Sequence, residues 1–421
     1  IYTGEDTLSL HDALPIFFLP SSAKTMPVTT QSRAASQQAN FNASNTGMVG
    51  LDPKTGQILL MVGSRNYFDT EIDGNYNIAL ANRQPGSAFK PFAYATAFSK
   101  GFQPETPIYD TLINFGPDGS GHDYIPHNYD GKFHGRLTMR QALAMSLNVP
   151  AVQTLALAGV EDTIKLATDM GITTLTDPKR YGLALVLGGA EVRPLDMANA
   201  FSVFGQEGRT HKTTSITKVL DRTGHEVVFH ETSESKQVLD PEVARKINSI
   251  LTDNAARTPI FGPRSPLAFP AGTVVAGKTG TTQNFRDAWT VGYTPSIAVA
   301  VWAGNNDNRP MHAGADGIFV AAPIWRAFID QALKKYPETG FTAYKPTASP
   351  QAAANLESAP AKTIYIDKKT GREIPESKAK KMKKGRVEKL STGDINISPE
   401  SLSGTTPMNL SDFQSFYAQN P

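Results

Sequence analysis

The sequence predicts an α+β domain built on one antiparallel sheet of five strands, with helices covering both faces. Two strand-like runs, 48–51 and 58–62, lie near its start and are joined by the turn residues of Asp52-Pro-Lys-Thr-Gly56. Three further strand-like segments follow only after residue 272, and the stretch between is mainly helical. We therefore expect strands from both parts of the chain to share one sheet, with the intervening helices packed on it.

Composition is that of a globular protein: 421 residues, 40% hydrophobic and 19% charged. The net charge of +2 gives no case for a nucleic-acid partner. The absence of cysteine excludes disulfides, thiolate metal sites and cysteine nucleophiles. No apolar run approaches the roughly 18 residues of a membrane span.

Four segments are expected along the chain. Residues 1–17 lack the basic start and long apolar stretch of a signal peptide and fit a non-native junction. Residues 18–45 are a Ser/Thr/Ala/Gln/Asn-rich linker, and 46–336 form the folded domain. Residues 337–421 are predicted to be a linker and a basic, poorly ordered tail, because the lysine run 378–389 has few apolar neighbours.

Caps and chain breakers place the elements of the domain. A capping box, Thr138-Met-Arg-Gln141, opens one helix, and Asp240-Pro241 opens another. Residues 102–135 have few periodic apolar positions and are predicted to be a long ordered surface loop. Helices are expected at about 87–100, 138–148, 151–157, 161–170, 194–204, 240–256 and 323–335. Strands or hairpins are expected at 214–229, 273–276, 288–293 with 297–303, and, in the tail, 365–374.

A serine and a lysine, Ser87 and Lys90, stand three positions apart where the first helix is expected to begin. This spacing puts both on one helix face, so the amine can reach the hydroxyl. A lysine takes a serine proton only when burial or a nearby cation lowers its pKa. Ser-x-x-Lys is common by chance, however, and an exposed serine beside a solvated lysine is the alternative.

A second motif is Gly277-Lys-Thr-Gly-Thr-Thr282. Residues 272–279 match the phosphate-loop pattern, but the strand-like surroundings argue against nucleotide binding. On a strand, Lys278 and the threonines can hold a substrate carboxylate, and Gly280 lets a substrate backbone approach closely. The backbone N–H of Thr281 could then join that of the serine in an oxyanion hole.

A third motif, Ser146-Leu-Asn148, falls at a predicted helix junction. With Ser-x-x-Lys before it and Lys-Thr-Gly after it, the order is one that chance rarely supplies. Here the chain resembles the penicillin-binding proteins, closely the transpeptidase domain of the bifunctional class A enzymes, over about 46–336. The matching stretches are Arg83-Gln-Pro-Gly-Ser-Ala-Phe-Lys-Pro91, Asn128-Tyr-Asp-Gly-Lys-Phe-His134, Ser146-Leu-Asn-Val-Pro150, Leu187-Gly-Gly-Ala-Glu191, Gly277-Lys-Thr-Gly-Thr-Thr282 and Asp287-Ala-Trp-Thr-Val-Gly-Tyr-Thr-Pro295.

The resemblance implies a role for each catalytic residue. Ser87 would be the acylated nucleophile and Lys90 its base. Ser146 would relay a proton to the leaving amine, Asn148 would hold the substrate peptide, and Lys278 would support Ser146.

It also implies a substrate-binding strand, in which Thr279 and Thr281 would bind the terminal carboxylate beside Gly280 and Thr282. The substrate would be the D-alanyl-D-alanine end of a peptidoglycan stem peptide, with β-lactams acting as mimics. No metal or other cofactor is implied. The expected location is the bacterial periplasm, at the outer face of the cytoplasmic membrane, and the natural full-length form would be membrane-anchored with a glycosyltransferase domain.

Other activities compete with this interpretation. A D,D-carboxypeptidase differs only in its acceptor, and a β-lactamase shares all three motifs. The Glu-x-x-Leu-Asn pattern of class A β-lactamases is absent downstream of Asn148, and Glu161 and Glu191 read as structural residues. A β-lactam sensor or wall-binding module without catalysis would keep the same fold. His122, His127 and His134 lack the spacing of a helical metal site.

Overall fold

A computed structural model describes most of the chain between residues 41 and 346. The predicted junction 1–17 and the predicted linker up to residue 40 lie outside the described residues, as does most of the predicted tail. The described ranges are 41–116, 122–216, 218–227, 234–337, 339–346, 362–367, 372–374, 377, 380–382 and 387–392.

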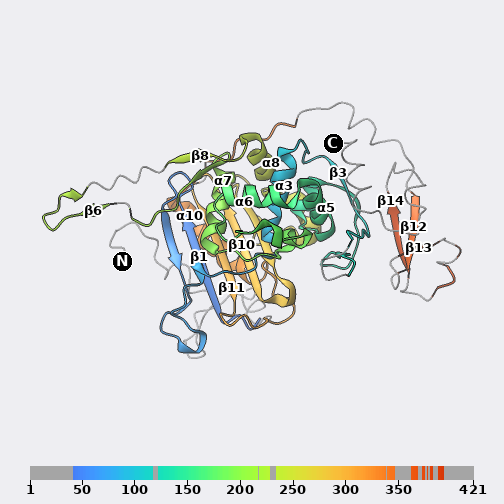
Figure 1. Ribbon diagram of the computed structural model, residues 1–421, viewed down its shortest axis with the longest axis horizontal. Coiled ribbons are helices and arrows are strands. Elements are labelled where there is room, and N and C mark those ends of the chain that lie inside the picture. The colour runs from blue at the N-terminus through green and yellow to red at the C-terminus, as the bar shows by residue number, and fades with distance from the viewer. Residues whose placement is uncertain are drawn as a thin grey trace.

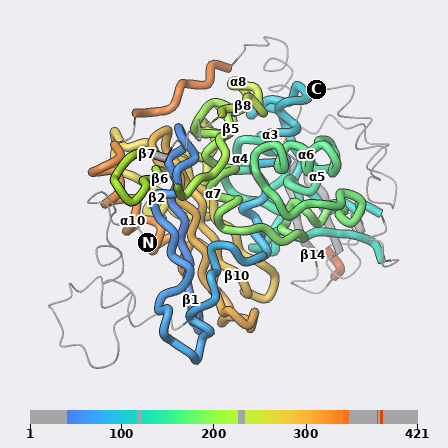
Figure 2. Tube along the Cα trace, turned by 60° about the vertical axis from the view of Figure 1, so that its left-hand side comes forward, coloured from blue at the N-terminus to red at the C-terminus, as the bar shows by residue number. Residues whose placement is uncertain are grey.

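The predicted five-stranded antiparallel sheet is confirmed, with the strand order β2-β1-β11-β10-β9. Its strands are β1 (Asn45–Leu51), β2 (Ile58–Val62), β9 (Ala276–Thr281), β10 (Asp287–Tyr293) and β11 (Ala298–Gly304). Strand β1 pairs with β11, with Met48 opposite Val301. The sheet's first strand in chain order therefore lies beside its last strand in chain order (Figure 2). Strands β2 and β9 form the two edges of the sheet.

Helices cover both faces of this sheet, as predicted (Figure 1). On one face α7 (Pro194–Gly205) packs against β1, β10 and β11, and α3 (Lys90–Ser99), α5 (Asn148–Ala158) and α8 (Pro241–Leu251) complete the layer. On the other face lies α10 (Ala321–Lys335). Burial of the apolar side chains between these layers stabilises the domain, since each removes apolar surface from water.

Shorter elements complete the described part of the chain. The other α-helices are α4 (Met139–Ala144), α6 (Val160–Asp169) and α9 (Asn254–Phe261). The short 3-10 helices are η1 (Thr70–Ile72), η2 (Ile78–Leu80), η3 (Gly86–Phe89), η4 (Pro178–Arg180), η5 (Leu183–Leu187) and η6 (Gln283–Phe285). The small sheets pair β3 (Pro107–Asp110) with β4 (Gly135–Thr138), β5 (Arg209–His211) with β8 (Ser235–Gln237), and β6 (Val219–Leu220) with β7 (Glu226–Val227).

Three sequence-based expectations need correction. The helix expected at 240–256 is two helices, because the Asp253 side chain accepts from Ala256 N and starts α9. The loop expected at 102–135 contains strand β3, which pairs with β4 at its far end. The strand expected at 273–276 begins only at Ala276.

The last of these corrections decides between the two interpretations of the Lys-Thr-Gly motif. The motif lies within strand β9, and the chain then returns antiparallel along β10. A phosphate loop requires a loop followed by a helix at this place, so the structure is incompatible with one.

The tail contains more strand than the sequence predicted. The expected strand-turn-strand at 365–374 corresponds to β12 (Lys362–Asp367) and β13 (Arg372–Ile374). A third strand, β14 (Val387–Thr392), pairs with β12 and takes in the end of the lysine run. In the described part of the molecule no helix combines the length and the apolar character needed to cross a membrane.

Candidate active site

Ser87 lies in the 3-10 turn η3, which continues directly into α3. Gly86 begins this turn with a φ of 53°, a left-handed conformation that glycine adopts without steric cost. Ser87 is half-buried, and neither its hydroxyl nor its backbone N–H has a hydrogen-bond partner among the described residues. Both groups are therefore available to a substrate.

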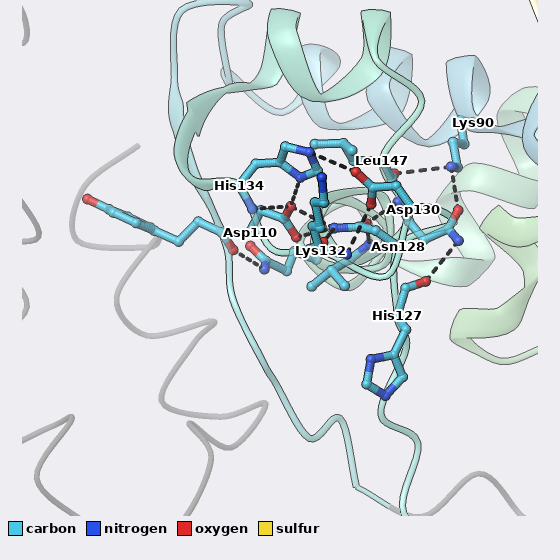
Figure 3. Close-up of polar contacts among 12 residues, drawn as sticks. Lys90, Asp110, His127, Asn128, Asp130, Lys132, His134 and Leu147 are labelled. Carbon is cyan, nitrogen blue, oxygen red and sulfur yellow. Dashed lines mark hydrogen bonds and ion pairs between the residues drawn. The ribbon is translucent and has the colours of Figure 1, made fainter. Parts of the chain in front are cut away.

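Lys90, one turn later, is fully buried and reaches the junction between α4 and α5. Its Nζ donates to the carbonyl oxygens of Ser146, at 2.6 Å, and Leu147, at 3.1 Å, and to Asn148 Oδ1, at 2.8 Å (Figure 3). Burial holds the pKa of Lys90 well below its ordinary value, and the positive charge of Lys278 lowers it further. This low pKa favours the neutral amine, which is the form of a lysine that can accept a proton. The structure shows no bond from its amine to the Ser87 hydroxyl.

Ser146 and Asn148 are held at that helix junction. Ser146 has a left-handed φ of 59°, which turns the chain between α4 and α5, and Asn148 is the first residue of α5. The Asn148 side chain bridges two segments, because its Oδ1 accepts from Lys90 and its Nδ2 donates to His127 O at 2.9 Å. Lys90 therefore lies beside the Ser146-Leu-Asn148 motif.

Lys278 brings the Lys-Thr-Gly motif to the same place. Its Nζ donates to Ser146 Oγ at 2.7 Å and to Thr279 O at 2.8 Å. Burial lowers the pKa of Lys278 to about 7, with a smaller contribution from the positive charge of Arg257. Hydrogen bonds accordingly join Lys90, Ser146, Asn148 and Lys278, and Ser87 lies three residues before Lys90, in the turn that leads into α3.

Strand β9 approaches η3 through glycine. A Cβ on Gly280 would lie 2.1 Å from Pro85 O, and one on Gly86 would lie 2.4 Å from Thr281 O. Ser87 follows Gly86 directly, so only glycines allow Ser87 to lie this close to the strand.

The pairing of β9 also orients the N–H of Thr281. Thr282 N donates to Asp287 O, toward β10, at 3.1 Å. In an antiparallel pair the N–H groups of alternate residues point to the partner strand, so the N–H of Thr281 points away from β10, to the side where η3 lies. This matches the predicted oxyanion hole of the Ser87 and Thr281 N–H groups.

The predicted substrate-binding residues differ in what their side chains contact. The Thr281 hydroxyl accepts from Gly317 N at 3.0 Å. Thr282 is buried, and its hydroxyl bonds to the Asp287 carboxylate at 3.2 Å and accepts from Asp287 N at 2.9 Å. Its hydroxyl thus bonds within the sheet, and its predicted part in substrate binding stays a prediction.

Two polar groups near the site were not found from the sequence. Asp110 is fully buried at the end of β3 and accepts from Asn128 and His134. Arg257, in α9, is 2% exposed, and lines a small void with Lys278. In the sequence, Asp110 could have been noticed only as the charged residue that ends the short run Pro107–Asp110. No sequence pattern points to Arg257.

The competing groups lie elsewhere. Glu161 and Glu191 are exposed, and neither bonds to a predicted catalytic residue within the described chain. His134 bonds to the carboxylates of Asp110 and Asp130. Among the described residues no three histidine, aspartate or glutamate side chains are placed to hold a metal ion.

Comparison with known proteins agrees with this geometry. Residues 46–330 match the family described as penicillin binding protein transpeptidase domain. The chain is 34% identical over 331 residues to penicillin-binding protein 2D of Bacillus subtilis and 35% identical over 299 residues to penicillin-binding protein 1A of Aquifex aeolicus. These alignments cover 77% and 70% of this chain but only 44% and 39% of the two relatives.

Comparison with solved structures also finds a penicillin-binding protein. The penicillin-binding protein PonA1 of Mycobacterium tuberculosis is similar with a TM-score of 0.61 and 26% identity, over 75% of this chain and 88% of that one. PonA1 has also been solved in complex with penicillin V, with the same TM-score and identity.

Proposed function

Because the chain belongs to the family of penicillin-binding protein transpeptidase domains, we propose that it is a serine D,D-transpeptidase that cross-links peptidoglycan stem peptides. The observation that carries the proposal is the convergence of Lys90, Ser146, Asn148 and Lys278 beside the half-buried Ser87. A serine next to two buried lysines has both a proton acceptor and a proton relay at hand.

In the first half of the proposed reaction, Ser87 Oγ attacks the carbonyl carbon of the penultimate D-alanine, and its proton passes to the neutral Lys90 amine. The N–H groups of Ser87 and Thr281 would stabilise the oxyanion, and each such donor is typically worth about 10² to 10³ in rate. Collapse of this intermediate breaks the peptide C–N bond. The leaving D-alanine amine takes its proton from the Ser146 hydroxyl, which is replenished by Lys278.

In the second half, an amine of a neighbouring stem peptide attacks the acyl-enzyme ester. The amine passes a proton through Ser146 to Lys278 and forms the amide cross-link. The ester C–O bond breaks, and Ser87 Oγ takes back the proton held by Lys90. Before acylation, the hydroxyls of Thr279 and Thr281 on edge strand β9 would hold the carboxylate of the terminal D-alanine, which leaves in the first half. Water in place of the amine would make the enzyme a D,D-carboxypeptidase.

The cellular setting is part of the same proposal. Peptidoglycan lies outside the cytoplasmic membrane, so the domain would act there, and the whole protein would carry an anchor and a glycosyltransferase domain. The penicillin V complex of PonA1 supports β-lactams as inhibitors of this chain. A β-lactamase and a non-catalytic β-lactam sensor are the alternatives that the experiment must distinguish from a transpeptidase.

Intact-protein mass spectrometry after mixing with benzylpenicillin tests the proposal, with Ser87→Ala as the control. We expect one adduct per wild-type chain that persists for hours, and none on the variant. Rapid loss of the adduct with turnover of penicillin would make the protein a β-lactamase. A folded wild-type chain without any adduct would overturn the serine mechanism.

A stable adduct alone fits a transpeptidase and a sensor equally well. Incubation with a D-alanyl-D-alanine peptide and an amine acceptor separates them, since only a transpeptidase releases D-alanine and forms the new amide. Release of D-alanine without the amide would identify a carboxypeptidase.

A further inference from the structure

A buried carboxylate lies behind the Ser146–Asn148 segment. Asp110 closes β3, and its side chain has no exposed surface. Its Oδ2 accepts from Asn128 Nδ2 at 2.6 Å, and from His134 N and Nδ1, both at 2.8 Å (Figure 3). A carboxylate that accepts from several N–H groups fixes the orientation of the groups that donate to it.

Asn128 transmits this orientation to α5. Its Nδ2 donates to the Asp110 carboxylate and to Lys132 O, at 2.8 Å, and neither group has a hydrogen to give back. The amide oxygen of Asn128 must therefore face the opposite way. There Oδ1 accepts from Asn148 N at 2.8 Å and from Val149 N at 3.1 Å.

Helix α5 depends on this contact, because it has no cap of its own. Its N-cap residue is Leu147, which has no side-chain acceptor, and Pro150 has no N–H. The first N–H groups of a helix need partners from outside it. The Asn128 oxygen supplies a partner to both Asn148 and Val149, and so fixes where α5 begins.

The position of Asn148 decides in turn where the amine of Lys90 is held. Asn148 Oδ1 is one of three acceptors around Lys90 Nζ, and the other two are the carbonyl oxygens of Ser146 and Leu147, immediately before it. A shift of the start of α5 would move all three acceptors together.

We propose that Asp110 is a positioning residue of this acyltransferase, which acts through Asn128 to hold Asn148 and the amine of Lys90 in place for attack by Ser87. The inference rests on the serine acylation proposed above. Asp110 touches neither substrate nor nucleophile in this scheme, and its effect passes through two hydrogen-bonded links.

The negative charge of Asp110 also affects the pKa of Lys90, separately from its effect on position. Burial and the Lys278 charge lower the pKa of Lys90, whereas the Asp110 carboxylate raises it. Among the described residues, the other ionisable groups that act on Asp110 or are affected by it are His134 and Tyr94. Loss of the Asp110 charge should therefore let Lys90 lose its proton at lower pH.

The test compares Asp110→Asn with wild type by the rate of benzylpenicillin acylation between pH 5 and pH 9. An asparagine offers only one oxygen to three N–H donors, so one donor loses its partner. We expect acylation to slow by about 10- to 100-fold, as for other small displacements of reacting groups. We also expect the acid limb of the pH profile to move to lower pH. A purely structural role would reduce the fraction of chains that acylate without moving that limb.

Asp130→Asn is the matched control. Asp130 pairs with the other ring nitrogen of His134, Nε2, at 3.2 Å, and lies in the same loop. The charge change is the same, but the direct link to Asn128 is intact, so rate and pH profile should stay close to wild type. Equal losses in both variants, or a wild-type rate and profile in Asp110→Asn, would overturn the inference.

Asn128→Ser provides the second route if Asp110→Asn yields no folded protein. It leaves the Asp110–His134 contacts in place and removes the link to Asn148, so acylation should slow to a similar extent. Unchanged acylation in Asn128→Ser would overturn the inference. Failure of the proposed function is distinct from either result, because wild type itself would then take no adduct.

Discussion

Three cationic side chains are buried around the site: Lys90, Lys278 and Arg257 are each at most 3% exposed. Within the described part of the chain none of them forms an ion pair. A buried charge without a partner is costly, and a lysine escapes the cost by losing its proton. Burial lowers the pKa of Arg257 only to about 10, so the guanidinium keeps its charge at neutral pH. Burial therefore favours the neutral amine of Lys90, whereas Lys278, with a pKa of about 7, both gains and loses its proton near neutral pH.

Lys278 makes this cost measurable. Its pKa of about 7 in the fold lies below its ordinary value of 10.5. Between these two pH values Lys278 holds a proton in the unfolded chain but not in the folded one. Its contribution to the free energy of unfolding therefore rises with pH. Relative to Lys278→Met, the free energy of unfolding of wild type should rise above pH 7 by up to about 1.4 kcal/mol per pH unit.

Urea unfolding of both proteins at several pH values measures this difference. Lys165→Met is the matched control, since its side chain is 74% exposed and gains little water on unfolding. A difference between wild type and Lys278→Met that stays constant from pH 6 to pH 10 would mean that Lys278 remains charged inside the fold.

The motif residues were predictable because each motif combines residue types with a short spacing. Lys90 follows Ser87 by one helical turn, and Lys278 lies within a strand. Asp110 and Asn128 have no such pattern, because they meet across 18 residues, and Asn128 reaches Asn148 across a further 20. Contacts of this kind depend on how β3 and its loop fold back, which local spacing does not encode.

At the scale of elements, the site depends on the contact between η3 and strand β9. Gly280 and Pro85 touch through backbone atoms, which cannot move aside as a flexible side chain can. Gly280→Ala should push β9 away from Ser87 and separate the two N–H groups of the proposed oxyanion hole. We expect benzylpenicillin acylation to slow by at least about 100-fold, the lower bound for loss of one oxyanion donor.

Gly182→Ala is the control for this substitution. Gly182 has an ordinary φ of −112°, and nothing lies within 4 Å of the position that its Cβ would take. Acylation of this variant should match wild type. If Gly280→Ala acylates at the wild-type rate while folded, the strand does not supply an oxyanion donor.

The start of a helix was predictable where the sequence contains a recognisable N-terminal capping motif. The capping box at Thr138 starts α4 at the next residue, as expected. The Asp253 cap was missed because the apolar periodicity of α8 carries on toward Ala256 without a glycine or proline between. Strand β3 was missed because four residues are too few to show alternation among the polar residues around them.

At the scale of the whole molecule, the number of strands and their antiparallel pairing were predictable from hairpins at both ends of the domain. The strand order was not, because the pairing of β1 with β11 joins the two ends of the domain. Nothing in either strand marks its partner. The predicted class and the observed sheet therefore agree, while the central pairing had to come from the structure.

This topology predicts cooperative unfolding. The sheet is continuous only when β1 joins β11, so neither end of the domain can bury its strands without the other. All three tryptophans, Trp289, Trp302 and Trp325, are fully buried in β10, β11 and α10, whereas acylation reports on Ser87 in η3. Tryptophan fluorescence and acylation competence should thus be lost at the same urea concentration. Loss of acylation well before the fluorescence change would show that η3 and α3 unfold separately from the sheet.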